Sequence, residues 1–170
     1  MACYHMFKIR LLFEIIEIFL ISKMLSLINY LLKQQRLMFN HIKTSKENKA
    51  IVTDLSRRLN LGAENIIARI AFAYSISNNR KLSVLNIKDS QGKEYSKNVL
   101  FGNNYSFYLA VLCTHYGIYK TDKDIPRYFK LHIDDGLELI NAELLDNPNL
   151  NGFDYIIEKI ELGLDQTNIV

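Results

Sequence analysis

Apolar residues recur with two different periods between residues 38 and 77, and this change of period limits the fold more than any other feature of the chain. Residues 38–44 alternate in part between apolar and polar, which is typical of a short strand or an extended arm. Residues 46–60 instead follow the helical period, and Ser45 stands where a helix N-cap belongs. The apolar side of this helix carries Ile51, Val52, Leu55 and Leu59. The pattern predicts a strand followed directly by an amphipathic helix.

A second helix follows almost at once. Leu61-Gly62 interrupts the first helix, because glycine suits the left-handed conformation at a helix end. Residues 63–77 are mostly small or apolar, which predicts a central and largely buried helix. The order strand, helix, tight glycine turn, helix is that of ribbon–helix–helix proteins.

The middle of the chain is expected to contain a short β element and another helix. Residues 82–87 and 94–101 are modest strand candidates, separated by the turn sequence Asp-Ser-Gln-Gly. Residues 105–119 predict a buried helix rich in aromatic side chains.

Two further helices are expected in the last third. One begins near Ile125-Pro126 and runs to about Leu145, with Gly136 inside it as a weak point. The other covers residues 153–162, is acidic and amphipathic, and stops at Gly163. The predicted fold is therefore mainly α with a short β element, a ribbon–helix–helix-like compact helical domain.

The composition excludes several functional classes. The chain of 170 residues contains two cysteines, too few for a disulfide framework or a four-thiolate iron–sulfur site, which fits a reducing cytoplasm. It contains neither a glycine-rich phosphate loop nor a nucleophile elbow. His132-Ile-Asp-Asp135 could belong to a metal or acid–base site, but one short run supplies few ligands, so an interface or capping role is favoured. We predict no catalytic residue, no metal and no cofactor.

Charge is distributed unevenly along the chain. Residues 1–37 carry five Lys or Arg and two acids, residues 38–130 carry fifteen and seven, and residues 131–170 carry one and nine. The basic middle segment is a candidate anion-binding region, and the acidic end is its opposite. Complementary fields of this kind also favour self-association.

The basic residues of the middle segment include one ordered group. Four cations line the strand end and the polar face of the first helix: Lys43, Lys46, Lys49 and Arg57. A row of this kind suits the phosphates of duplex DNA, and Arg58 and Arg69 are weaker candidates for support. The alternative is an ordinary solvated helix face, and for Arg69 a structural ion pair with Glu64 or with the acidic tail.

The acidic residues of the fourth helix recur at helical spacing. They are Asp134, Asp135, Glu138, Glu143 and Asp146. They predict either a solvated face or a surface that meets a basic partner.

The first 37 residues differ in composition from the rest of the chain. Residues 11–32 are rich in Leu, Ile and Phe but contain Glu14, Glu17 and Lys23, so a membrane span is marginal and a secretory signal fits poorly. We interpret residues 1–37 as a hydrophobic extension upstream of a true start at Met38. A helix that packs on a partner is the alternative. The remaining domains are predicted as residues 38–145, which bind DNA, and residues 146–170, an acidic helix and tail.

Three blocks of the sequence resemble the DndE family of bacterial DNA sulfur modification (phosphorothioation) proteins. The first is residues 40–77, especially residues 59–75; the second is Gly92-Lys-Glu-Tyr95 with residues 99–102; the third is residues 132–140. The resemblance implies DNA binding with a preference for nicked duplex, a homo-tetramer, and action beside a cysteine desulfurase and an iron–sulfur partner in the Dnd system.

Three functions are therefore carried forward. The first is a non-enzymatic, cytoplasmic DNA-binding subunit of a phosphorothioation complex. The second is a sequence-specific ribbon–helix–helix repressor, in which Asn40, Ile42 and Thr44 would read base edges in the major groove. The third is a membrane-associated or purely structural protein, which depends on residues 1–37.

Overall fold

The computed structural model describes residues 22–29 and 39–167, in two units that are treated separately, residues 1–38 and 39–170. In the first unit, residues 22–29 are helical and expose Met24 and Leu25. The predicted start at Met38 and most of the hydrophobic extension lie outside the described residues. Within the described ranges, no helix is both long enough and apolar enough to cross a membrane.

The second unit begins with a two-stranded antiparallel sheet. Strand β1 (His41–Lys43) pairs with β2 (Glu94–Ser96), and Ile42 lies opposite Tyr95. Both of these side chains are buried, so the pair closes one edge of the core. Of the two strand candidates, residues 82–87 form no strand, and residues 94–101 form one only at Glu94–Ser96.

Two features explain why these segments are not longer strands: residues 84–86 are not buried, and Ser96 caps a helix. Residues 84–86 form a short 3₁₀ turn, η1 (Val84–Asn86), none of whose residues is buried, so a strand there would gain little apolar contact. The second candidate is a strand for only three residues, because the Ser96 hydroxyl accepts a hydrogen bond from the Val99 amide and starts helix α4 (Lys97–Phe101).

The two helices after β1 follow the predicted pattern. Helix α2 (Lys46–Leu59) begins at Ser45, whose hydroxyl accepts a hydrogen bond from the Asn48 amide. It ends at Asn60, which takes the left-handed conformation that the sequence assigned to the glycine turn. Helix α3 (Glu64–Ser77) follows. The predicted order of strand, helix, turn and helix is confirmed. Strand β1 pairs with β2 of the same chain rather than with a strand of a second copy.

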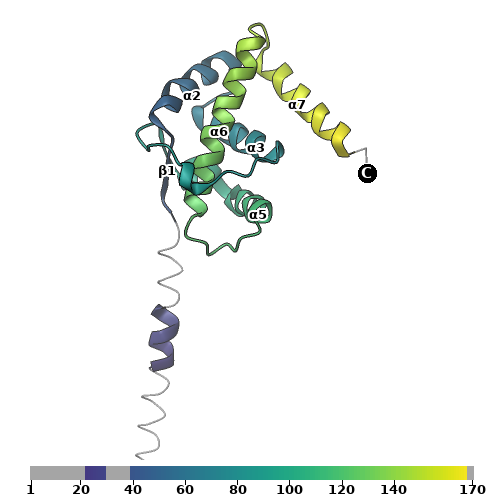
Figure 1. The fold of residues 1–170 in the computed structure, drawn as a ribbon. Helices are drawn as coiled ribbons and strands as arrows, with labels where there is room; N and C mark the ends of the chain where they lie inside the picture. Colours follow the sequence, from purple (N-terminus) through teal and green to yellow (C-terminus); the bar gives the residue numbers. More distant parts are fainter. Residues whose placement is uncertain (1–21, 30–38, 168–170) are drawn as a thin grey trace, which may run out of the picture. The chain divides into compact units, whose positions relative to one another are not determined.

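Helix α6 (Ile125–Asp146) is the axis of this unit, and α3 packs across it (Figure 1). Its 22 residues span about 33 Å. Gly136 is buried in the seam, where an added Cβ would lie 1.9 Å from the carbonyl oxygen of Ala71 on α3. Gly136 is therefore the residue that lets the two backbones approach, and the expectation of a weak point is corrected.

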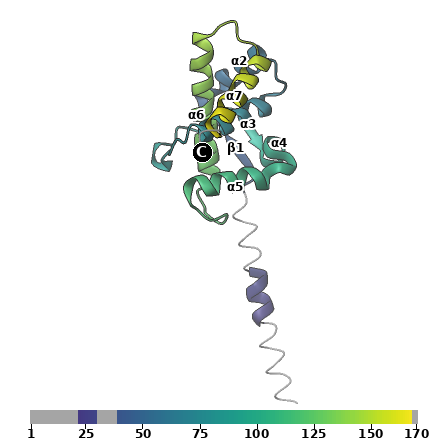
Figure 2. The same ribbon diagram turned by 90° about the vertical axis from the view of Figure 1, so that its right-hand side faces the viewer.

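Aromatic side chains fill the core beside this seam. The ring of Phe129 on α6 lies 4.7 Å from Phe101 and 5.1 Å from Phe72, centroid to centroid. After the turn η2 (Gly102–Asn104), helix α5 (Tyr105–Tyr116) lies with α4 toward the start of α6 (Figure 2). Only its Leu112 is fully buried, so α5 is more exposed than the sequence predicted.

The last helix, α7 (Gly152–Thr167), leaves the C-terminal end of α6 (Figure 1). It runs through Gly163 rather than stopping there, because a glycine in a helix interior costs only about 1 kcal/mol and this one needs no left-handed backbone. Tyr155 is fully buried and ties α7 to the rest of the unit. The resulting fold is a compact, mainly helical unit with a small β-ribbon.

Candidate nucleic-acid interface

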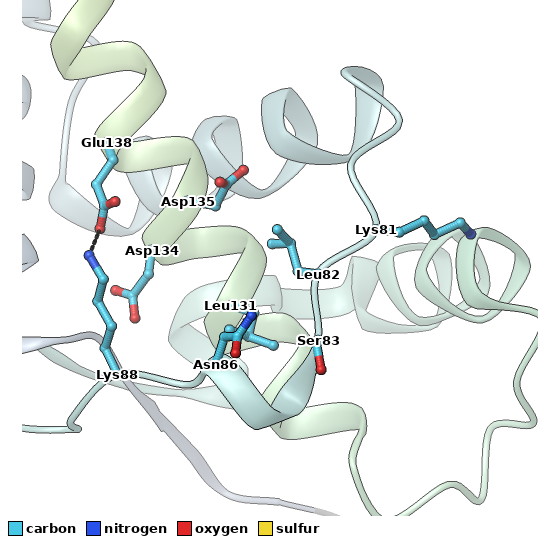
Figure 3. A pocket seen from close by; sticks show the side chains of 9 residues that line it. All are labelled: Lys81, Leu82, Ser83, Asn86, Lys88, Leu131, Asp134, Asp135 and Glu138. Carbon is cyan, nitrogen blue, oxygen red and sulfur yellow. Dashed lines mark hydrogen bonds and ion pairs between the residues drawn. The ribbon is translucent and has the colours of Figure 1, made fainter.

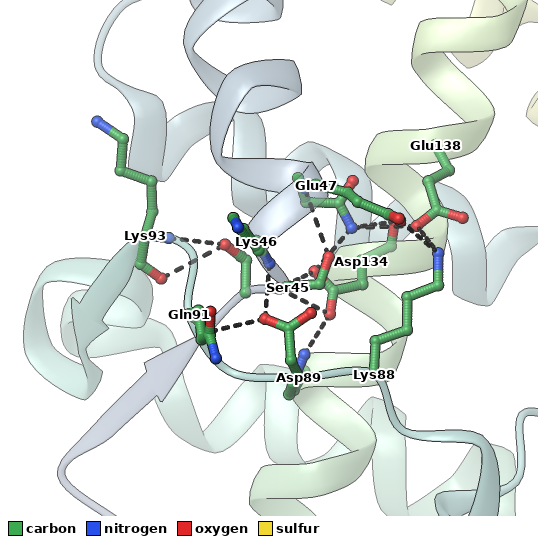
Figure 4. Close-up of polar contacts among 12 residues, drawn as sticks. Ser45, Lys46, Glu47, Lys88, Asp89, Gln91, Lys93, Asp134 and Glu138 are labelled. Atoms are coloured by element: carbon green, nitrogen blue, oxygen red, sulfur yellow. Dashed lines mark hydrogen bonds and ion pairs between the residues drawn. The ribbon is translucent and has the colours of Figure 1, made fainter.

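The first turn of α2 is held in place by a carboxylate from α6. Asp134 accepts hydrogen bonds from the backbone amide of Ser45, at 3.0 and 3.2 Å, and from the side-chain amide of Asn48, at 2.9 Å. It also pairs with Lys130 at 2.5 Å, and both charged groups are almost completely buried. A negative charge at a helix N-terminus is favourable, so Asp134 fixes where α2 begins (Figure 4).

The loop before β2 adds a second set of contacts to the same turn. Asp89 accepts from the amides of Lys46 and Gln91, both at 2.9 Å, and these hydrogen bonds hold the pKa of Asp89 below its usual value. The Lys88 ammonium bridges Glu138 on α6, at 2.7 Å, and Glu47 on α2, at 3.3 Å (Figure 4). The start of α2 is thus anchored from two sides.

The four cations of the predicted row are all exposed, but they differ in their partners. Lys43 pairs with Glu94 across the β-ribbon at 3.0 Å, and Arg57 pairs with Asp54 one turn earlier at 3.5 Å. Lys46 and Lys49 make no ion pair with any residue in the described ranges. The side chains free to neutralise a bound anion are therefore concentrated in the first turn of α2.

The two supporting arginines do not join this row. The Arg58 guanidinium donates to the carbonyl oxygens of Leu144 and Asn147, which places it at the C-terminal end of α6. It satisfies carbonyls that have no partner inside the helix and is favourable at that end of the helix dipole. Arg69 is half-buried on α3, and the anticipated pair with Glu64 does not form.

Glu64 has other partners, which sequence reasoning missed. It accepts from the Thr53 hydroxyl at 2.7 Å and pairs with Lys93 at 3.0 Å. Burial alone would raise the pKa of Glu64. The Thr53 hydrogen bond and the Lys93 ion pair outweigh this effect and hold the pKa below its usual value. Lys93 reaches Glu64 at the start of α3 only because β2 pairs with β1, so no local sequence signal could have identified it.

His132 lies in a buried hydrogen-bond chain rather than in a metal site. Its Nδ1 is 2.7 Å from the Ser75 hydroxyl, its Nε2 is 2.7 Å from the Tyr116 hydroxyl, and Ser75 donates to Asp135 at 2.7 Å. Because Ser75 gives its proton to Asp135, its oxygen accepts from His132, which assigns the ring proton to Nδ1. Within the described residues no group of three potential metal ligands occurs.

This network predicts a pH dependence of stability. Burial, with the nearby positive charges of His115, Lys81 and Arg80, lowers the pKa of His132 to about 3. Below the ordinary value of about 6.5 the unfolded chain therefore binds a proton that the folded protein excludes. We expect the free energy of unfolding to fall by roughly 2 kcal/mol between pH 7 and pH 5, as measured by urea denaturation.

The control compares how steeply the free energy of unfolding changes with pH in two proteins, not how stable each protein is at pH 7. His132→Gln removes the titrating ring and is expected to flatten the pH profile over this range, whatever its stability at pH 7. Equal slopes for the two proteins would contradict this account of His132.

Four of the five acids expected to form a solvated face on α6 are instead engaged within the unit, and only Asp146 among these five is simply exposed. A surface hollow of about 240 Å³ lies between residues 81–88 and α6, and three carboxylates line it (Figure 3). Each has a cation partner: Asp134 has Lys130, Asp135 has Arg80 and Glu138 has Lys88. Glu143 is likewise bonded to Tyr74, Tyr155 and Lys159. These acids connect elements within the unit.

The fold and this site together define a class, namely small, mainly helical proteins whose strand–helix–helix segment packs on one long central helix. Residues 41–146 match the family described as DNA sulphur modification protein DndE, which is more than half of the chain. The chain belongs to the DndE family, as its sequence blocks indicated.

Two solved structures show the same fold. DndE from Escherichia coli B7A, described as involved in DNA phosphorothioation modification, shares 20% identity at a TM-score of 0.50, and the match covers 61% of this chain and 98% of that one. A DndE variant with two glycine-to-lysine substitutions, described as involved in DNA phosphorothioation, shares 21% identity at a TM-score of 0.51, with 60% and 97% coverage. Among curated protein sequences nothing matches this chain.

Proposed function

We propose that this protein is a non-enzymatic DNA-binding subunit of a bacterial DNA phosphorothioation system. The observation that carries the proposal is the pair of exposed lysines in the first turn of α2, Lys46 and Lys49, which have no acidic partner in the described residues. They lie about 4.5 Å apart along the helix axis. Lys43 and Arg57 extend the row on either side, with their charges partly neutralised by Glu94 and Asp54.

The anchoring of α2 supports this assignment. Two lysines contribute most to phosphate binding when the helix that carries them is already rigid, because less conformational entropy is then lost on binding. The contacts of Asp134 and Asp89 supply that rigidity from α6 and from the loop before β2. We extend the proposal to Arg58 and Arg69 only as indirect support, through the position of the helix ends.

The sulfur chemistry is assigned to partners rather than to this chain. Cys113 is half-buried, and burial together with nearby Asp122 raises the pKa of its thiol, which lowers the fraction of reactive thiolate. We therefore propose that the chain acts in the cytoplasm beside other proteins of the Dnd system, as a homo-tetramer that grips double-stranded DNA, with nicked duplex as the preferred form.

Two of the three residues that would contact bases in the repressor alternative are buried. Ile42 is 3% exposed and Thr44 is fully buried, and the Thr44 hydroxyl accepts from the Lys93 amide at 2.9 Å. Neither side chain can reach a base edge without breaking the β-ribbon. Phosphate contact without base readout is therefore the favoured mode.

A titration on intact, nicked and single-stranded DNA over a range of salt concentrations tests the proposal. Lys46→Gln combined with Lys49→Gln is expected to reduce the magnitude of the salt slope, in log–log form, by about 2, because each phosphate contact contributes about 1. Lys120→Gln, an exposed lysine of the α5–α6 connection, is the matched control and should leave the slope nearly unchanged.

Three outcomes would count against the proposal: binding that ignores salt, an equal loss in the control, or a sharp consensus sequence in a selection for bound DNA. The third outcome would favour the repressor. Arg58→Gln is a useful comparison, because the Arg58 guanidinium bonds to the end of α6. This substitution should lower the melting temperature clearly but change the salt slope little.

A further inference from the structure

The outer face of α7 carries a row of exposed apolar side chains. Phe153, Ile157 and Ile160 are 71%, 38% and 56% exposed, and Leu164, at 58%, continues the row. Their spacing of four, three and four residues is that of the contact positions of a coiled coil, and it places all four within about 60° around the helix. A row this regular is typical of a helix that packs against another helix.

The opposite face of α7 fixes the direction in which this row points. Tyr155 is fully buried, and the Lys159 ammonium pairs with Glu143 of α6. At the start of the helix, Gly152 lies against the backbone of Leu59, where an added Cβ would be 2.0 Å from the carbonyl oxygen. Since these contacts hold the inner face, α7 cannot turn its apolar row inward without losing them.

A groove between α7 and α3 continues the apolar surface. Its volume is about 250 Å³, and its lining includes Ile70, Ala73 and Tyr74 from α3 and Ile156 and Ile160 from α7. Ile160 belongs both to the row and to the groove, so the two form one surface. Ala73 is small and exposed, which permits the backbone of a further helix to approach closely.

Charge identifies the kind of helix that fits. Three exposed acids, Asp154, Glu158 and Glu161, lie on the other flank of the row, away from the groove. A second α7 packed against this face would bring like charges together, and DNA would be repelled. A helix whose flank carries lysine or arginine would instead pair with the acids while its apolar residues cover the row.

We propose that the surface formed by the α7 row and the α3–α7 groove is the docking site for an amphipathic helix with a basic flank, supplied by another protein. The surface lies beyond residue 146, where the match to the DndE family ends, apart from the α3 side of the groove. Its acidic border gives it the opposite electrostatic preference to the lysines of α2, so the two surfaces bind different partners.

The test uses the full chain and two synthetic helical peptides of about 21 residues, measured by fluorescence anisotropy. Both peptides carry the same apolar row; one has lysine on its flanks and the other glutamate, and like charges keep each from pairing with itself. We expect the basic peptide to bind at least about tenfold more tightly than the acidic one.

Variants of the chain make the test specific. Ile157→Gln with Ile160→Gln should weaken binding of the basic peptide by about tenfold or more, whereas the control Leu85→Gln with Leu145→Gln, two exposed leucines outside α7, should not. Glu158→Lys with Glu161→Lys should reverse the preference between the peptides. Circular dichroism establishes that each variant is folded.

The proposal is overturned if neither peptide binds, if both bind equally, or if the charge reversal leaves the preference unchanged. It is also overturned if sedimentation shows that Ile157→Gln with Ile160→Gln abolishes self-association of the native chain, because a second copy would then be the occupant of the row.

Discussion

Gly136→Ala is expected to destabilise the protein by about 3 kcal/mol or more, because the new methyl group has no space. A Cβ at this position would lie 1.9 Å from the carbonyl oxygen of Ala71 and 2.5 Å from its carbonyl carbon. Both atoms belong to the backbone of α3, so relief requires the two helices to separate along their seam. Urea denaturation, compared with the native chain, gives the difference in the free energy of unfolding.

Gly163→Ala is the matched control for this change. Gly163 also lies inside a helix, but an added Cβ there meets no atom within 4 Å. Since alanine is the better helix former, this substitution is expected to stabilise the protein by up to about 1 kcal/mol. If both substitutions destabilise by similar amounts, the close approach of α3 and α6 at Gly136 is not what determines the cost.

Asp134→Asn is expected to cost about 3–5 kcal/mol, the second large effect. The substitution leaves Lys130, which is 5% exposed, with a buried charge that has lost its directly paired carboxylate. It also weakens the hydrogen bonds that hold the first turn of α2, at the amide of Ser45 and the side chain of Asn48. Thermal or urea denaturation measures the loss, and DNA binding by the folded fraction should weaken as well.

Two further variants separate these causes. Lys130→Met combined with Asp134→Asn removes the buried charge and should recover much of the stability, because a buried pair replaced by apolar groups is often tolerated. Asp54→Asn breaks an exposed ion pair with Arg57 and should change the stability by less than about 1 kcal/mol. A single Asp134→Asn variant as stable as Asp54→Asn would show that the Lys130–Asp134 pair is not buried in solution.

The candidate interface could be predicted only in part. Three cations of the row, Lys46, Lys49 and Arg57, follow from the helical period of residues 46–60. That period also placed their exposure correctly, since apolar contact on the other side of α2 leaves this face to solvent. The partners of those cations could not be predicted. Glu94 reaches Lys43 through strand pairing, and Leu144 and Asn147 engage Arg58 at the far end of a helix nearly ninety positions later.

Local chemistry accounts for what the sequence by itself determined. Helix periodicity, the Ser45 cap and the turn after α2 act over a few residues, so the strand, α2, α3 and the start of α6 are predictable from their own segments. The resemblance of three spaced blocks to the DndE family is also a property of the sequence alone.

Only the tertiary structure determines which strand pairs with β1, which close contact requires glycine at position 136, and which charges are neutralised. Each of these depends on groups far apart in the chain that meet only when α6 packs against α2 and α3. The physical reason is that burial changes what a charge requires. An acid on a helix face is expected to seek water, but an acid brought to a helix N-terminus beside a buried lysine becomes the contact that holds the elements together.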